Sequence, residues 1–232
     1  MICVTSDLHG YPLESFLSLL DRAGFSDGDL LFILGDVVDR GKDGVRTLLW
    51  IMEQPNVFLI LGNHEEMMLA SRPLIGEVTE ELVRSLNSDT LASFERWIRN
   101  GGKVTAEALN ALPPEKRAAV FEFVCDLPLY EEVSAGGREF LLVHSGLGNF
   151  DPKKSPGDYT PDELLWHRLS PDERYYDDII TVFGHTPTAY LDRDRRGRAI
   201  FTDTWIDVDC GAAGGIPPML LRLDDMREFY VS

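Results

Sequence analysis

The stretch LLFILGDVVDRG, residues 30–41, is an apolar run that ends in a glycine and then presents Asp36, Asp39 and Arg40 within five positions. A continuous apolar run of this kind is typical of a strand that is buried on both faces. Two carboxylates and a guanidinium directly after such a strand could form a solvated loop. They could equally be a metal ligand, a partner that orients an acid, and a clamp for an anion. This segment alone leaves both interpretations open.

The segments around this stretch alternate between strand and helix patterns through residue 72. Short apolar strands are expected over 2–5, 29–34 and 56–61, and each is followed by apolar residues at helical spacing, over 11–25, 43–54 and 64–71. A β-α-β-α-β-α order with continuous apolar strands predicts a parallel sheet.

Residues 73–127 read as helical, with helices expected over 77–86, 88–100, 105–112 and 113–127. We interpret this part as a helical insertion that packs on the sheet within a single domain of residues 1–232. Strands return over 129–135, 138–144, 179–185, 199–210 and 217–232, and their tight turns favour antiparallel pairing. The predicted fold class is α/β, with two stacked mixed sheets and helices outside them.

Composition narrows the classes of partner. The chain has 232 residues, 44% of them apolar, and its net charge is −17 from 39 acidic and 22 basic residues. Such an acidic surface disfavours binding to nucleic acid or an anionic membrane, so neither partner is expected. An anionic substrate would need local positive charge, which metal ions could supply. Three cysteines without a CxxC pair, no secretory leader and no long apolar run predict a cytoplasmic location.

Five strand ends share one form, an apolar run followed by a glycine-containing turn that carries Asp, Asn or His. In the first three, ligand-type residues are 29 positions (7 to 36) and 27 positions (36 to 63) apart, roughly the length of a βαβ unit. Parallel strands joined by such units place their carboxyl ends on one edge of the sheet, where open α/β sheets bind ligands. The five segments are 2–10, 30–41, 57–65, 140–146 and 180–186.

The side chains expected to converge offer oxygen and nitrogen ligands and no thiolate. They are Asp7, His9, Asp36, Asn63, His144 and His185. This set suits one or two divalent ions such as Mn²⁺, Fe²⁺ or Zn²⁺. Two ions need a bridging ligand, and the two oxygens of Asp36 make it the natural candidate. Each turn has a simpler alternative, such as Asn63 capping a helix, but recurrence at five strand ends favours a common site.

These segments also resemble a known family. SDLHG, GDVVDRG, GNHE, HSG and GHT look like the signature blocks of the calcineurin-like metallophosphoesterases, and the match runs from residue 2 to about 215. The ending of GDVVDRG is similar to the serine/threonine phosphoprotein phosphatase branch. The segments 97–102 and 164–168 resemble a phage and bacterial subgroup that includes lambda-type protein phosphatases and symmetrical dinucleoside tetraphosphatases. The resemblance implies a four-layer α/β/β/α sandwich, with Ser6 and Cys210 as departures from the usual residues.

The resemblance also implies a role for each matching residue. Asp7 and His9 would bind one metal and Asn63, His144 and His185 a second, with Asp36 bridging. His64 would be the general acid, oriented by Asp39 and kept charged near neutral pH by it. Arg40 and Arg168, with Asn63, would bind the substrate phosphate. The implied cofactors are two divalent ions, Mn²⁺ first, with Fe²⁺ or Zn²⁺ as alternatives.

Three functions compete at this point. The first is a phosphoprotein phosphatase-like phosphomonoesterase that attacks phosphorus in line with metal-activated water and acts on phosphorylated proteins or small phosphate esters. The second is a symmetrical bis(5′-nucleosyl)-tetraphosphatase, which would need a further basic or aromatic subsite in 73–127 or 149–175, where Lys153 and Lys154 are candidates. The third, an inactive phosphate-binding module, is disfavoured because no ligand or acid position is lost. His167 is expected at the rim or in a structural role, and the oligomeric state stays open.

Overall fold

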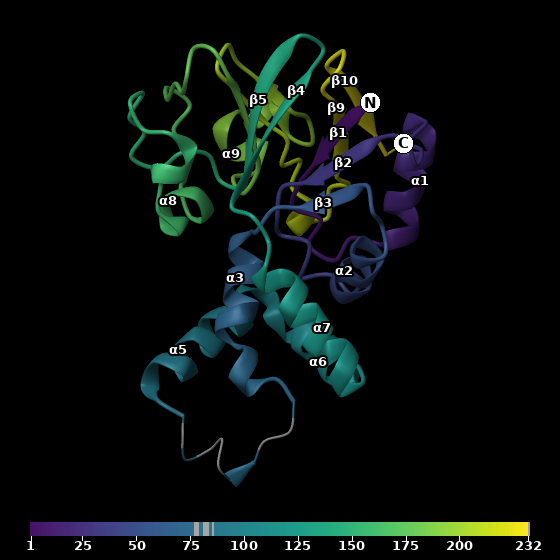
Figure 1. Cartoon of the computed structure of the whole chain (residues 1–232), viewed down its shortest axis with the longest axis vertical. Helices are drawn as coiled ribbons and strands as arrows, with labels where there is room; N and C mark the ends of the chain where they lie inside the picture. The colour runs from purple at the N-terminus through teal and green to yellow at the C-terminus, as the bar shows by residue number, and fades with distance from the viewer. Residues whose placement is uncertain (77–78, 81–83, 85, 232) are drawn as a thin grey trace.

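The computed structural model describes residues 1–76, 79–80, 84 and 86–231, and in this part ten strands form two five-stranded sheets (Figure 1). The first sheet has the order β10-β9-β1-β2-β3. Its strands are β1 (Ile2–Thr5), β2 (Leu30–Ile33), β3 (Val57–Leu59), β9 (Met219–Arg222) and β10 (Arg227–Tyr230). The second sheet has the order β4-β5-β6-β8-β7. Its strands are β4 (Tyr130–Ala135), β5 (Arg138–Val143), β6 (Ile180–Phe183), β7 (Ile200–Phe201) and β8 (Trp205–Asp207).

The first sheet confirms the predicted parallel half. β1 pairs with β2 and β2 with β3, both in parallel, and the crossovers are α1 (Leu13–Ala23) and α2 (Gly44–Met52). α3 (Asn63–Ala70) follows β3. α1 buries one apolar face through Phe16, Leu19 and Leu20, and it ends at Gly24, which takes the left-handed conformation of a helix cap. The carboxyl ends of β1, β2 and β3 therefore lie on one edge.

The second sheet corrects the expectation of antiparallel pairing. At its two edges β4 pairs with β5 and β7 pairs with β8, both antiparallel. In its centre β6 pairs in parallel with β5 and with β8. Connections of 36 residues (144–179) and 21 residues (184–204) separate these strands, long enough for the crossovers that parallel pairing needs. The single strand expected over 199–210 is two strands, β7 and β8, because the chain turns at Thr202, whose hydroxyl accepts the Trp205 N–H at 2.9 Å.

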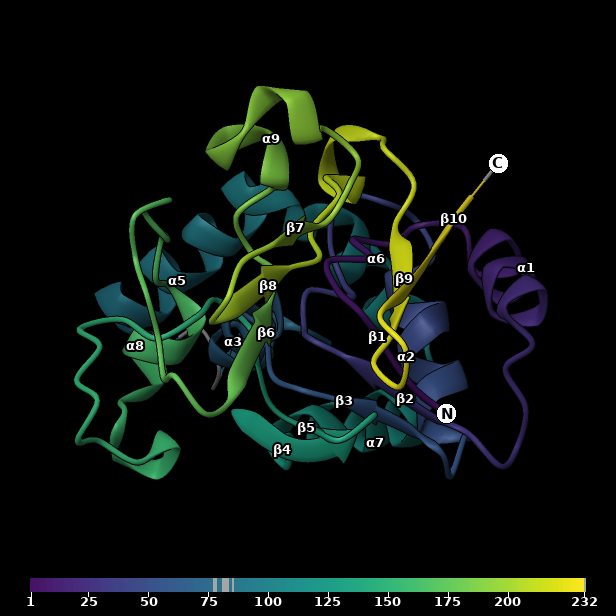
Figure 2. The ribbon, with the colours of Figure 1, turned by 90° about the horizontal axis from the view of Figure 1, so that it is seen from above.

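Side chains that alternate along the strands define the layers. Val4 and Phe32 point between the sheets and share a core with Phe140 and Val182 of the second sheet. Their neighbours Cys3 and Leu31 point the other way, into a core covered by helices. The outer face of the second sheet is covered by α8 (Pro161–Leu165) and the chain around it. Figure 2 shows α8 on the side opposite α1 and α2, so the fold is the expected α/β/β/α sandwich with a thin fourth layer.

The helices of the insertion lie at one end of the molecule, below the sheets in Figure 1. They are α5 (Ser88–Trp97), a π-helical turn (Ile98–Gly102), α6 (Lys103–Ala111) and α7 (Pro114–Cys125). α5 and α7 contact α3, and α6 contacts α2. Trp97, Leu109 and Val124 belong to the same core as Cys3 and Leu31, and on this ground we propose one domain over 1–232 with an insertion over 73–127. The helix predicted over 77–86 falls largely outside the described residues.

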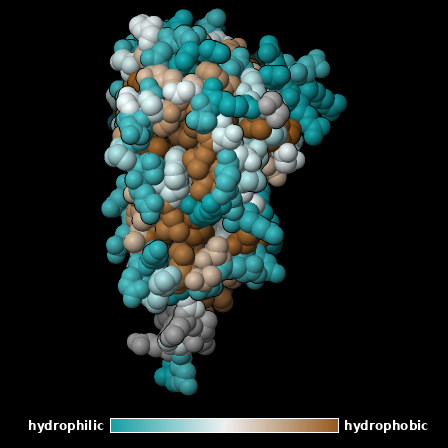
Figure 3. Space-filling view, turned by 90° about the vertical axis from the view of Figure 1, so that its right-hand side faces the viewer, coloured by the Kyte–Doolittle hydropathy of each residue, from teal (hydrophilic) through white to brown (hydrophobic). Residues whose placement is uncertain are grey.

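The surface combines polar and apolar areas. Figure 3, seen from the side on which α1 and α2 lie in Figure 1, shows hydrophobic surface bordered by hydrophilic residues. Apolar atoms on the surface are normal for a folded domain. Within the described residues, no helix is both long and apolar enough to cross a membrane.

Candidate active site

The loops at the carboxyl edge of the sheets have a strained backbone. Six residues there have positive φ, between 43° and 72°: Asp7, His9, Asp36, Asp39, Arg40 and His185. Among the other described non-glycine residues only Asn149 and Met226 share this conformation. Side chains with a Cβ rarely adopt it, and each such residue costs roughly 1–3 kcal/mol. Hydrogen bonds between loops hold it, including Asp7 N to Gly35 O at 3.1 Å and His9 N to Asp36 O at 2.8 Å.

Two glycines let the loops after β2 and β3 touch. Gly35 has a φ of 86°, and a Cβ placed on it would lie 2.6 Å from the Cα of Gly62. A Cβ on Gly62 would in turn overlap the backbone nitrogen and a carboxylate oxygen of Asp36. The glycines that precede Asp36 and Asn63 in the sequence are therefore required for these two side chains to approach one another.

Asp36 lies at the centre of the buried residues. Its Oδ1 accepts the His64 N–H at 3.0 Å and lies 3.5 Å from His144 Nε2, while its Oδ2 lies 3.6 Å from His9 Nε2. Two groups of ligand atoms each lie within 4.8 Å of one another, one from His9, Asp36 and His64 and one from Asp36, His144 and His185. One carboxylate thus faces two separate groups of imidazoles.

The histidine tautomers are fixed by backbone carbonyl groups. His9 Nδ1 lies 3.2 Å from Val38 O, and His144 Nδ1 lies 2.7 Å from Leu34 O. Because a carbonyl oxygen only accepts, each Nδ1 carries a proton, and a ring protonated there alone has its lone pair on Nε2. Burial lowers the pKa of His9 to about 3, which keeps this ring neutral.

These lone pairs face other acceptors. His144 Nε2 lies 2.9 Å from Asn63 Oδ1, and His9 Nε2 faces the carboxylates of Asp7 and Asp36. Among the described residues, none gives the buried His185 Nε2 a hydrogen-bond partner. Converging lone pairs without protons between them are unfavourable unless a cation lies among them, so these residues fit divalent metal ions.

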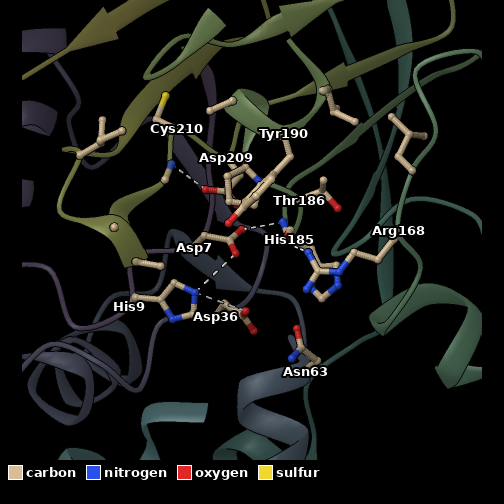
Figure 4. A pocket seen from close by; sticks show the side chains of 18 of the residues that line it. Asp7, His9, Asp36, Asn63, Arg168, His185, Thr186, Tyr190, Asp209 and Cys210 are labelled. Atoms are coloured by element: carbon tan, nitrogen blue, oxygen red, sulfur yellow. Dashed lines mark hydrogen bonds and ion pairs between the residues drawn. The ribbon is translucent and has the colours of Figure 1, made fainter. Parts of the chain in front are cut away.

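Among the described residues, the donors to Asp7 all bind one of its two carboxylate oxygens. Its Oδ2 accepts hydrogen bonds from Ser6 Oγ at 2.5 Å and from His185 N at 2.9 Å, and its Oδ1 lies 3.7 Å from His9 Nε2. Ser6, which stands where the family pattern usually has glycine, therefore supplies a donor to this carboxylate. Figure 4 shows Asp7, His9, Asp36, Asn63 and His185 pointing toward one another, so the predicted residues from distant segments do meet.

Glu65 supports the Asp36 loop, a role that the sequence interpretation missed. This fully buried carboxylate accepts the N–H groups of Asp36 at 2.8 Å, Val37 at 2.9 Å and Val38 at 3.1 Å. The alternative that Asn63 caps α3 is wrong, since the cap residue is Gly62 and the Asn63 side chain faces His144.

Asp39 and His64 form a buried pair with a 2.6 Å separation between Oδ2 and Nδ1. The insertion supplies two further donors to Asp39, Trp97 Nε1 at 2.9 Å and Thr105 Oγ1 at 2.6 Å. Trp97 is fully buried, and its indole N–H fixes the position of the Asp39 carboxylate.

Ionisation of this pair differs from the sequence-based expectation. Burial raises the pKa of Asp39 to about 7. Burial, and secondarily Arg40, lowers the pKa of His64 to about 3. Burial thus favours the neutral His64 ring, in contrast to the expectation that Asp39 keeps it charged.

Arg40 and Arg168 line the cavity that these residues surround. A terminal nitrogen of Arg40 lies 3.3 Å from His64 Nε2, and Arg168 donates to His185 O at 3.1 Å. In the described part of the chain, neither guanidinium has a carboxylate within 4.0 Å. The cavity has a volume of about 820 Å³, and Asp7, His9, Asp36, Asn63, His64 and His185 also line it. Two unpaired cations beside a cluster of metal-type ligands suit a phosphoryl group.

The cavity also contains residues that were not predicted. Asp209 follows β8 in a glycine-containing turn of the same form as the others, and its Oδ1 accepts the Gly211 N–H at 2.8 Å. Burial and the nearby Asp7 raise the pKa of Asp209 well above its usual range. Burial and Asp209 likewise raise the pKa of the Cys210 thiol, which disfavours a reactive thiolate. His167 does not line the cavity, and its Nε2 contacts Glu173 at 2.8 Å.

Comparison with known proteins identifies the family. The model of the calcineurin-like phosphoesterases matches residues 1–205. The chain belongs to this family. Calcineurin-like phosphoesterases use two metal ions, in agreement with the two ligand groups that share Asp36.

Proteins to which this calcineurin-like chain is similar in sequence include bis(5′-nucleosyl)-tetraphosphatases. It is 24% identical over 247 residues to an asymmetrical bis(5′-nucleosyl)-tetraphosphatase PrpE of Halalkalibacterium halodurans, covering 92% of this chain and 87% of the relative. It is 36% identical over 97 residues to a symmetrical bis(5′-nucleosyl)-tetraphosphatase of Wigglesworthia glossinidia brevipalpis, covering 40% of this chain. The match spans only 35% of that symmetrical relative.

Solved structures share the fold. A protein provisionally named a diadenosine tetraphosphatase matches with a TM-score of 0.65 and 18% identity, over 98% of this chain and 90% of the other. A serine/threonine phosphatase from Saccharomyces cerevisiae with similarity to human PP5 matches with a TM-score of 0.52 and 19% identity, over 94% and 71%. At these identities the likeness shows the calcineurin-like fold alone.

Proposed function

We propose that this chain is a metal-dependent hydrolase of phosphoric esters and anhydrides whose substrate is a dinucleoside polyphosphate. The observation that carries the proposal is Asp36, whose two oxygens face separate groups of imidazoles beside two arginines that have no carboxylate partner in the described part of the chain. Asp7, His9 and Asp36 would hold one ion, and Asp36, Asn63, His144 and His185 would hold the second. Bound ions supply an activated water for in-line attack and neutralise charge on the phosphoryl group.

The chain's own residues bind the substrate and move a proton. Arg40 and Arg168, with Asn63, bind the phosphoryl oxygens, for which the planar guanidinium is well suited. His64 Nε2 faces Arg40, and therefore faces the position of the phosphoryl group. Protonated there, His64 donates to the departing oxygen, while Asp39 on Nδ1 fixes the orientation of the ring.

The size of the cavity and the names of the relatives favour the dinucleotide. A cavity of about 820 Å³ is far larger than one phosphoryl group needs and falls in the range that holds nucleotide-sized ligands. The relatives matched by sequence include both symmetrical and asymmetrical bis(5′-nucleosyl)-tetraphosphatases. Such a substrate, together with the exposed free thiol of Cys125, also fits the predicted cytoplasmic location.

A phosphoprotein phosphatase-like phosphomonoesterase is the second candidate, and the Asp39–His64 pair favours it. The alkoxide that leaves a phosphoserine or another alkyl ester is strongly basic and needs a proton donor. A nucleotide that leaves an anhydride is less basic and depends less on one. Such an enzyme would act on phosphorylated proteins or small phosphate esters.

Turnover of three substrates by the purified chain tests the proposal. Protein loaded in turn with Mn²⁺, Fe²⁺ and Zn²⁺ is given diadenosine tetraphosphate, a phosphoserine peptide and p-nitrophenyl phosphate. We expect the highest kcat/KM with diadenosine tetraphosphate, with Mn²⁺ as the most effective ion. Two molecules of ADP would show symmetrical cleavage, and ATP with AMP asymmetrical cleavage. Turnover of the two monoesters alone would favour the second candidate, and no turnover with any ion would refute both.

A further inference from the structure

A third arginine lines the cavity without an assigned role. Arg40 and Arg168 lie beside the metal-type ligands and account for one phosphoryl group, and Arg196 lines the same cavity. Within the described residues, none of the three has a carboxylate within 4.0 Å, although acidic residues outnumber basic ones 39 to 22. In so acidic a chain, three unpaired arginines around one cavity indicate a ligand with more than one anionic group.

Arg196 differs in this respect from the arginines next to it. It follows α9 (Thr188–Leu191) and a 3₁₀ turn (Arg193–Arg195), directly after the His185 loop. Arg193, Arg195 and Arg198 do not line the cavity, and the Arg198 guanidinium lies 4.1 Å over the Tyr230 ring. This segment lies outside 73–127 and 149–175, the regions in which the sequence suggested a basic subsite.

The lysines suggested for that subsite are engaged elsewhere or lie away from the cavity. Lys154 Nζ is 3.4 Å from Glu163 and 4.6 Å from the centre of the Tyr159 ring. Neither Lys153 nor Lys154 lines the cavity. The cation that can reach a second anionic group is therefore Arg196.

Tyr190 supplies an aromatic surface to the cavity that Arg196 also lines, and we call these two residues the rim of the cavity. Tyr190 is 82% exposed, and neither its ring nor its hydroxyl has a partner among the described residues. Figure 4 shows it extending over the cavity toward Asp7. Trp166, which also lines the cavity, is occupied, since its Nε1 donates to Glu66 at 2.7 Å and the Arg96 guanidinium lies 3.9 Å over its ring. Tyr190 therefore has a ring face free to stack on a planar ligand.

We propose that Tyr190 and Arg196 form a second subsite for the part of a nucleoside polyphosphate beyond the reacting phosphorus. Tyr190 stacks on a base, and Arg196 binds a phosphate that does not react. The inference rests on the proposed function, and it names the residues that select the substrate. A nucleotide offers a flat ring and a second anionic group together, whereas a phosphoserine peptide offers one phosphate, which Arg40 and Arg168 already serve.

The test compares rim variants with matched controls. Tyr190→Ala removes the aromatic ring, and Tyr190→Phe keeps it. Arg196→Ala removes a positive charge that lines the cavity, and its control Arg195→Ala removes one that does not. For the Mn²⁺-loaded full chain, kcat and KM are measured with diadenosine tetraphosphate and with p-nitrophenyl phosphate. Inhibition of p-nitrophenyl phosphate hydrolysis by ADP, compared with inorganic phosphate, gives a measure of binding that needs no turnover of the dinucleotide.

We expect Tyr190→Ala to raise KM for diadenosine tetraphosphate and the inhibition constant of ADP about tenfold, the usual size of a lost base–aromatic stack. Arg196→Ala should raise both about fivefold, as for one partly solvated charge pair. Both variants should leave p-nitrophenyl phosphate hydrolysis and inhibition by inorganic phosphate within about twofold, as should Tyr190→Phe and Arg195→Ala with every ligand.

The outcomes separate the subsite from the proposed function. Equal losses on both substrates, or no change in ADP inhibition, would overturn the subsite. Weakened hydrolysis of an acidic phosphoserine peptide, with ADP inhibition unaffected, would reassign the rim to peptides and overturn it as well. If the wild-type chain does not cleave diadenosine tetraphosphate, the proposed substrate is wrong, and the ADP inhibition constants of the variants still decide the subsite.

Discussion

At the floor of the cavity, Asp36 and His9 are almost completely buried, and each is held by a hydrogen bond to a backbone group. At the rim, Tyr190 is 82% exposed, and Tyr190 and Arg196 have no side-chain partner among the described residues. Floor residues therefore have one available geometry, and rim residues have several. Reaction chemistry needs fixed positions and selection of a substrate tolerates adjustment, so we assign the reaction to the floor and selectivity to the rim.

The largest effect should come from the centre of the floor. Asp36→Asn replaces the shared carboxylate by a neutral amide, and we expect kcat to fall by about 10³-fold or more on every substrate, because several kcal/mol of charge stabilisation depend on the metal ions. Metal analysis should show fewer bound ions. Asp172→Asn, an exposed carboxylate on a loop, serves as the control. Full metal content with normal turnover in Asp36→Asn would remove Asp36 as a ligand.

The next effect should depend on the leaving group. His64→Asn and Asp39→Asn should lower kcat about 10²-fold for an alkyl phosphate ester, which needs a proton on its departing oxygen. The loss should be several-fold smaller for p-nitrophenyl phosphate, whose nitrophenolate leaves without one. Metal content should stay unchanged. Equal losses on both esters would show that the pair does not donate the proton.

A smaller effect should follow from a substitution of Glu65, which supports the Asp36 loop at the floor of the cavity. Glu65→Gln weakens the acceptor for three backbone N–H groups of the Asp36 loop, so the affinity for Mn²⁺ should fall about 10–100-fold, as is usual for residues that orient metal ligands. Titration with Mn²⁺, followed by calorimetry, measures it. Glu66→Gln is the matched neighbour, because its carboxylate binds Trp166 instead of this loop. Similar affinities in the two variants would contradict the assigned role of Glu65.

The smallest effect is expected at His167, which precedes Arg168 but does not line the cavity. His167→Gln should change kcat/KM by less than about twofold with any of the substrates, because the ring contacts Glu173 and not the phosphate site. Steady-state kinetics with diadenosine tetraphosphate and p-nitrophenyl phosphate check this. A tenfold loss would extend the catalytic residues beyond the floor.

Repetition along the chain made the floor predictable. Asp7, Asp36 and Asn63 recur after apolar strands at the spacing of βαβ units, and parallel strands bring such positions to one edge. The parallel pairing of β5 and β6 was not predicted, although the structure brings His144 and His185, which follow these strands, to Asp36. Short-range patterns carry little information on strand direction, which depends on how long connections cross the sheet.

The residues that hold Asp39 and the Asp36 loop, and those proposed to select the substrate, depend on contacts that no local sequence pattern carries. Trp97 and Thr105 reach Asp39 from 58 and 66 residues away, and Glu65 serves backbone groups of the preceding loop. Tyr190 is one of seven tyrosines, and only its exposed position over the cavity distinguishes it.

By itself the sequence determined the α/β class, the order of the strand ends and the chemical types of the floor residues. These depend on the hydrophobic period of each segment and on the few side chains that can bind metal and phosphate. Only the tertiary structure decided which oxygen of Asp36 faces which imidazole, which groups hold Asp39 and the Asp36 loop, and which arginine lies free at the rim. Distance, burial and hydrogen-bond direction between remote segments arise when the chain packs, and the free energy of those contacts exists only in the folded state.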